Sequence, residues 1–144
     1  MTGKEQLEKI EVLRKKVEEQ TYFVQELRSA LDGVTGIDYD RERVQTSVSG
    51  DPMLQKLCRI EEEEEKLKQM IIRYQCHKVR MIRRIHKMDI GKKQTLLYNV
   101  YIERKSLWEC TEIMQWSYDH TKKMHRLALE EFEMTPDDTT EHLE

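Results

Sequence analysis

Basic and aromatic side chains gather near the end of this 144-residue chain, on a segment with helical spacing. Between residues 118 and 132, Met124, Ala128 and Phe132 recur at four-residue steps, so one face of a helix buries them. The other faces then carry Tyr118, His120, Lys122, Lys123 and Arg126. Such a helix fits the major groove of DNA, where Lys and Arg donate to guanine or neutralise phosphates. A small helical bundle whose last helix has a solvated charged face is an equally good interpretation of this spacing.

Two shorter helices are predicted before it. Ser106 and Glu109 have the spacing of a capping box, in which the hydroxyl accepts a backbone N–H and the carboxylate reaches back. After the turn at residues 115–117, Ser117 can cap the next helix, with Asp119 near the positive end of its dipole. An earlier apolar stripe ends at the charged turn 103–105 and consists of Leu96, Leu97, Val100, Tyr101 and Ile102. The segment 93–132 therefore predicts three helices that form a helix-turn-helix unit.

The order of residues here resembles that of a known class of phage proteins. The run LLYNVYIERKSLWECTEIMQWSYDHTKKMHRLALEEF (96–132) resembles the C-terminal part of phage transcriptional regulators of the RinA and ArpU type, which are similar to region 4 of sigma-70 factors. The upstream run RVQTSVSGDPM (43–53) also looks like a segment that these proteins carry between their helical parts. The resemblance implies a helix-turn-helix regulator that binds double-stranded DNA, activates late phage genes and engages the host RNA polymerase.

These observations assign candidate contacts with DNA. The residues expected to contact base edges are Tyr118, Asp119, His120, Lys122 and Lys123. The residues expected to contact phosphates are Arg104, Lys105, Ser117 and Arg126.

Three positions depart from the general helix-turn-helix pattern. Thr111, Gln115 and Thr121 stand where that pattern has a small residue, a turn glycine and an aliphatic residue. We expect Gln115 to carry a cost, because glycine adopts a positive φ angle more readily than glutamine does.

Charge is distributed unevenly along the chain, although the net charge is only −3. Residues 76–126 hold 12 basic and 5 acidic groups, a net charge of +7. Residues 1–75 hold 13 and 16, and residues 127–144 hold 0 and 7. The positive third coincides with the predicted helix-turn-helix unit, as a phosphate-binding surface requires.

The first half of the chain predicts two long helices with coiled-coil spacing. One covers residues 4–31 with a seam of alternating three-residue and four-residue steps, interrupted only by Gln20. The other begins at Asp51-Pro52, a favourable cap and first helical residue, and continues to Met88. The two helices can pair within one chain as an antiparallel hairpin or between chains as a homodimer through this stalk.

The predicted fold class is therefore all-α. It consists of a long helical hairpin, a coiled-coil-like stalk, followed by a C-terminal helix-turn-helix bundle similar to sigma-70 region 4. The expected domains are a stalk at 1–75 with a connecting loop at 32–51, a DNA-binding domain at 76–133, and a disordered acidic tail at 134–144.

Several other classes of function lack support. Cys58, Cys76 and Cys110 form no Cys-x-x-Cys pair, and the histidines lack metal-ligand spacing, so we expect neither metal nor cofactor. Catalytic motifs are absent, and we expect no enzyme. No apolar run has the length of a signal peptide or membrane span, so a soluble cytoplasmic protein is expected.

Two rival hypotheses remain open. The chain can be a coiled-coil protein-interaction module that never binds DNA, since the two seams suffice for that. It can also be a small phage DNA-packaging subunit that recognises DNA.

Overall fold

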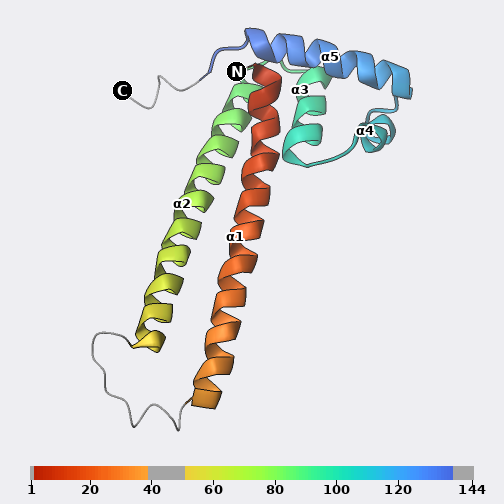
Figure 1. The fold of residues 1–144 in the computed structure, drawn as a ribbon. Coiled ribbons are helices and arrows are strands. Elements are labelled where there is room, and N and C mark those ends of the chain that lie inside the picture. The colour runs from red at the N-terminus through yellow and green to blue at the C-terminus, as the bar shows by residue number, and fades with distance from the viewer. Residues whose placement is uncertain (1, 39–50, 138–144) are drawn as a thin grey trace. The chain divides into compact units, whose positions relative to one another are not determined.

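The computed structural model describes residues 2–38 and 51–137, with side chains for 2–32 and 51–137. Within this part of the chain all regular structure is helical, so the prediction of an all-α fold is confirmed. The helices are α1 (Gly3–Asp38), α2 (Pro52–His86), α3 (Lys92–Leu97), α4 (Leu107–Met114) and α5 (Tyr118–Met134), with a π-helical segment η2 (Tyr98–Ile102) after α3 (Figure 1). None of the described helices is long and apolar enough to cross a membrane.

Local signals set most helix beginnings. The Asp51 carboxylate accepts the Met53 N–H at 3.0 Å, which agrees with the predicted start of α2. The end of α1 differs from the prediction, because the helix continues through Gly33 to Asp38 and does not end at Asp32. The predicted loop at 32–51 is therefore shorter, and residues 39–50 lie outside the described residues.

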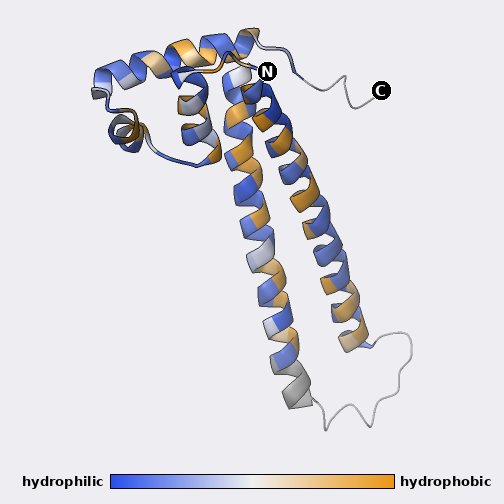
Figure 2. Ribbon diagram, turned by 180° about the vertical axis from the view of Figure 1, so that it is seen from behind, coloured by the Kyte–Doolittle hydropathy of each residue, from blue (hydrophilic) through white to orange (hydrophobic). Residues whose placement is uncertain are grey.

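The chain forms two compact units, and both long helices contribute to each. Figure 2 shows apolar and polar residues interspersed along these helices. One unit comprises residues 14–73, and the other comprises residues 1–13 with 74–144. The predicted boundary at 75/76 lies close to the observed one, but the prediction placed the first 13 residues with the stalk. Leu7 and Ile10 instead belong to the core of the second unit, so we call residues 1–13 and 74–144 the head unit.

In the unit of residues 14–73, polar contacts join α1 to α2. The Gln20 Nε2 atom donates to the backbone oxygen of Glu63 at 3.0 Å and to its carboxylate at 3.1 Å. Arg28 and Glu64 form a mostly exposed ion pair at 2.7 Å. Gln20, the polar residue in the seam of α1, thus has a defined partner on α2. Two of the five consecutive glutamates at 61–65, Glu63 and Glu64, contact α1 through their carboxylates.

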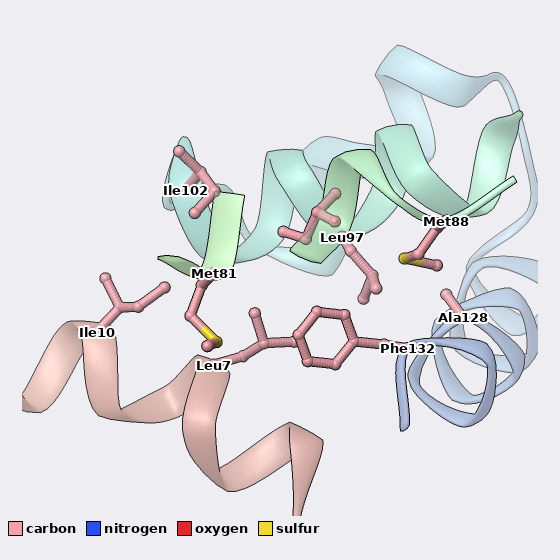
Figure 3. Close-up of a cluster of buried hydrophobic side chains, with 9 residues drawn as sticks. Leu7, Ile10, Met81, Met88, Leu97, Ile102, Ala128 and Phe132 are labelled. Carbon is pink, nitrogen blue, oxygen red and sulfur yellow. The ribbon is translucent and has the colours of Figure 1, made fainter. Parts of the chain in front are cut away.

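The core of the head unit gathers apolar residues from α1, α2, α3, the η2 segment and α5, together with Met88 after the end of α2. In Figure 3 the Phe132 ring lies at the centre of this cluster, near the side chains of Leu7, Met81 and Leu97. Ile85 near the end of α2 and Met88 just after it share this cluster with Leu97 of α3. Burial of Ala128 and Phe132 in this cluster therefore holds one face of α5 against the core.

Arg84 belongs to the positively charged stretch of residues 76–126, yet it lies inside this unit. Only 7% of its surface is exposed, and its guanidinium stacks on the Phe132 ring at 4.2 Å. It donates to the backbone oxygens of Thr135 and Phe132 at 3.0 and 3.1 Å and to Gln6 Oε1 at 3.0 Å. Arg84 therefore joins α1 and α2 to the end of α5 and is not available to DNA.

The prediction that a disordered tail begins at residue 134 is also wrong. Met134 ends α5, and Thr135 is buried with its hydroxyl donating to the Glu131 backbone oxygen at 2.8 Å. Asp137 lies 3.3 Å from Arg80. Contacts with α2 thus order residues 134–137, while residues 138–144 lie outside the described part of the chain.

Candidate nucleic-acid interface

The turn between α4 and α5 has two serine caps and one left-handed residue. The Ser106 hydroxyl accepts the Glu109 N–H and the Ser117 hydroxyl accepts the His120 N–H, both at 3.2 Å. Both serine hydroxyls therefore cap their helices as predicted. Gln115 ends α4 with φ 58° and ψ 44°, in the left-handed region that the sequence pattern assigns to glycine.

Replacing Gln115 with glycine is expected to stabilise the protein by about 1 kcal/mol, because glycine adopts this conformation without the Cβ penalty. Urea denaturation followed by circular dichroism measures the change. Glu112→Gly is the matched control: it lies in the α4 interior, where glycine is expected to cost about 1 kcal/mol. A destabilised Gln115→Gly variant would contradict the strain that the φ angle indicates.

The outward face of α5 carries the predicted DNA contacts. Thr121, Ala128 and Phe132 are fully buried, which fixes the inward face of the helix. At 3.6 residues per turn, the opposite face carries Asp119, Lys122, Lys123 and Arg126, and all four are exposed. We call Lys122, Lys123 and Arg126 the basic face of α5. The acidic residues Glu130 and Glu133 follow, so positive charge is confined to the first half of the helix.

Aromatic rings flank the basic face on both sides. On one side, Tyr118 stacks on Trp108 with ring centroids 4.2 Å apart and planes within 9°, and the Lys122 ammonium lies over the Tyr118 ring at 5.0 Å. On the other side, His120 meets Trp116 edge to face at 4.9 Å, and Lys92 lies 5.8 Å from the Trp116 ring. The structure thus brings Tyr118, His120 and Lys122 into ordered contacts at the beginning of α5.

The two predicted phosphate contacts before α4 have different surroundings. Arg104 has φ 59°, and its Nε atom lies 3.5 Å from the Glu11 carboxylate. Both side chains are about half exposed, and such a pair contributes only about 0–1 kcal/mol, so a phosphate can compete for Arg104. Lys105 is half-buried next to the Ser106 cap, and its backbone N–H donates to Asn99 at 2.9 Å.

A tyrosine and a histidine support α5 from the side of the core. The Tyr101 hydroxyl lies 2.9 Å from His125 Nε2, and the rings stack with centroids 5.7 Å apart. Burial raises the pKa of Tyr101 to about 12, with a further contribution from Glu8. Burial lowers the pKa of His125, and the positive charge of Lys4 lowers it further.

Mild acid is expected to destabilise the protein through His125 and His77. Burial also lowers the pKa of His77, outweighing the hydrogen bond to the Gln6 backbone oxygen, while Arg80 and Lys9 act in the same direction. Since both folded-state pKa values lie below the unfolded value of about 6.5, the unfolded state binds more protons in this range. The stability contribution is thus fully present above the unfolded pKa and is lost as pH falls through the folded-state values.

Thermal unfolding between about pH 7.5 and pH 5, above the range where most carboxylates titrate, measures this loss. His77→Gln and His125→Gln should each flatten the dependence of melting temperature on pH. His86→Gln is the control, because His86 is exposed. A wild-type melting temperature that stays constant over this range would contradict the role of the two histidines.

No set of three His, Cys, Asp or Glu residues within the described ranges is arranged to hold a metal ion. Comparisons with protein-family models, curated protein sequences and solved structures find no match to this chain.

Sequence reasoning did not assign roles to Trp108, Trp116 or Lys92 at this surface. One signal was present, because Trp108 does not fall on the stripe formed by Leu107, Cys110 and Met114. A tryptophan beside such a stripe points away from the core. The pairing of each ring with a side chain of α5 depends on the turn geometry and could not be predicted from spacing.

Proposed function

We propose that this protein is a DNA-binding transcriptional regulator whose α4 and α5 act as a helix-turn-helix, with α5 in the major groove. The observation that carries the proposal is the basic face of α5, which is exposed while the opposite face is buried. Positive charge is confined to the first half of α5. This supports a docking in which the N-terminal end of α5 enters the major groove, because recognition helices contact base edges with their N-terminal residues.

The side chains divide by chemistry into two groups. Lys122 and Lys123 can donate to guanine acceptors, and Asp119 can accept from the cytosine amino group. Tyr118 and His120 complete the set proposed to contact bases. Phosphate contacts are assigned to Arg104, Lys105 and Ser117, which precede α4 or α5, and to Arg126, which lies on the basic face in the middle of α5. Backbone N–H groups at a helix beginning favour anions, which supports the assignment at Ser117.

The same proposal includes an antiparallel hairpin of α1 and α2. In each unit, contacts between these helices support it: Gln6 with His77 in one, and Gln20 with Glu63 in the other. Gln6 precedes Gln20 in α1, whereas its partner His77 follows Glu63 in α2. Antiparallel helices require this reversed order of partners.

The resemblance to RinA-type and ArpU-type regulators supplies the biological part of the proposal. It suggests a phage or prophage protein that activates late genes and engages the host RNA polymerase. This part rests on the order of residues in 96–132 and 43–53.

Fluorescence anisotropy tests the proposal directly. Labelled duplexes from phage late promoter regions, with scrambled duplexes as controls, are titrated with the full-length protein at several salt concentrations. We expect preference for one promoter and a logarithmic salt dependence with a slope of about −0.9 per phosphate contacted. Absence of binding even at low salt would refute a DNA-binding function.

A protein-interaction module is the second candidate, because the unit of residues 14–73 exposes several large apolar side chains. They are Tyr22, Phe23, Leu54, Leu57, Ile71 and Ile72. Light scattering of the full-length protein tests self-association through these side chains. A dimer that Tyr22→Glu and Ile72→Glu dissociate would favour this candidate, whereas a monomer that binds DNA would favour the regulator.

A further inference from the structure

The indole of Trp108 is the most exposed large aromatic surface near the basic face of α5. Its exposed fraction is 64%, yet it is held in a parallel stack with Tyr118 at 4.2 Å. An isolated surface tryptophan has free rotamers, whereas this stack fixes the plane of the indole and leaves much of the ring open to solvent. The ring is therefore oriented before any ligand arrives, which lowers the entropic cost of contact.

The surroundings of this ring restrict what can cover it. The Lys122 ammonium lies 5.0 Å from the Tyr118 ring centre, and Lys123 and Arg126 follow on the exposed face of α5. The complementary ligand therefore presents a small apolar group close to negative charges. In duplex DNA the base planes are stacked and unavailable, and in the major groove only thymine presents a carbon substituent, its C5-methyl group. Phosphates lie along the edges of the same groove.

We propose that Trp108 is a specificity-determining residue that contacts a thymine methyl group in the major groove. The inference rests on the proposed DNA-binding function and goes beyond it by naming a base and a chemical group. Trp108 lies at the beginning of α4 and contacts the first residue of α5, Tyr118. The thymine therefore lies toward one edge of the recognition site, beside the bases that Lys122 and Lys123 contact.

The test begins with a random library of duplexes from which the full-length protein enriches a preferred sequence. Each thymine of that sequence is then replaced by deoxyuridine, which removes only the methyl group. At one or two positions, the affinity of the wild-type protein is expected to fall about fourfold, which is the factor that corresponds to the burial of one methyl group. In Trp108→Ala the same replacements should change affinity by less than a factor of about 1.5, whereas Trp108→Phe should retain part of the discrimination.

One control variant and one independent readout keep the outcomes separate. Ile113→Ala, also an exposed apolar residue of α4 at 46% exposure, should keep the full effect of deoxyuridine. A duplex with 5-iodouracil at the sensitive position should crosslink to Trp108 on irradiation, as peptide mass spectrometry detects. This second readout does not depend on how well the variants bind.

The results also distinguish the inference from the function on which it rests. Absence of binding to any duplex at low salt refutes the DNA-binding function itself, and binding that enriches no sequence refutes the sequence recognition on which the inference rests. An enriched duplex whose deoxyuridine replacements act equally on wild type and Trp108→Ala, or a crosslink at another residue, overturns the role of Trp108 alone. In that case the indole is free for a protein partner.

Discussion

Replacing both Lys122 and Lys123 with alanine is expected to weaken DNA binding by about tenfold to a hundredfold at moderate salt. Both side chains are exposed on the basic face of α5, so each can release counterions from a phosphate or donate to a base edge. If both contact phosphates, the logarithmic salt slope becomes shallower by about 1.8. Anisotropy titrations between about 50 and 200 mM salt measure affinity and slope together.

The chain offers a matched control for this experiment. Lys15 and Lys16 are also adjacent and exposed, but they lie on α1 in the other unit. Their double alanine variant changes the net charge by the same amount and should leave both affinity and salt slope close to wild type. Equal losses for the two pairs would indicate a general charge effect and would remove the assignment of α5 as the recognition helix.

Replacing Arg84 with methionine is expected to lower the free energy of unfolding by about 3–4 kcal/mol. Methionine retains most of the apolar volume but removes the guanidinium that donates to the backbone oxygens of Phe132 and Thr135 and to the Gln6 side chain. The Phe132 oxygen still accepts the Thr135 N–H, whereas the other two acceptors lose this donor. Each hydrogen bond to a charged group contributes about 1.5–3 kcal/mol, although losses from one residue are not additive. Urea denaturation at neutral pH measures the change.

Two further variants identify the cause. Arg84→Lys retains the charge but not the planar set of donors, so it should recover only part of the stability. Arg73→Ala removes an exposed arginine from α2 and should change the free energy of unfolding by less than about 0.5 kcal/mol. Wild-type stability in Arg84→Met would show that the three acceptors find other donors, and the role of Arg84 as the link between α1, α2 and α5 would be lost.

The sequence predicted those parts of the fold that depend on neighbouring residues. Apolar periodicity indicated the helices, and Asp51, Ser106 and Ser117 marked three helix beginnings, because a cap acts within three residues. The same reasoning missed the continuation of α1 through Gly33, since glycine weakens a helix without forbidding it. It also missed the π-helical geometry of residues 98–102, where the apolar stripe looks the same as in an ordinary helix.

Contacts between distant residues explain the remaining differences. The basic face of α5 was predictable, because the burial of Ala128 and Phe132 fixes which side chains point outward. Arg84 looked like one member of a basic cluster, and nothing near it in the sequence indicates a partner at Gln6 or Thr135. The Trp108 and Tyr118 stack likewise spans two helices and depends on a left-handed turn at Gln115.

The contact between the two ends of the described chain has a consequence for how the protein is made. The Gly3 backbone N–H donates to the Glu133 carboxylate, 130 residues later, and Leu7 lies in the same core as Phe132. On the ribosome α1 emerges long before α5, so the core of the head unit cannot close until α5 has been translated. Contacts so distant in sequence slow folding, and the apolar residues of the nascent α1 stay exposed meanwhile. A chain that stops before α5 keeps this surface uncovered and is a natural target for chaperones and proteases.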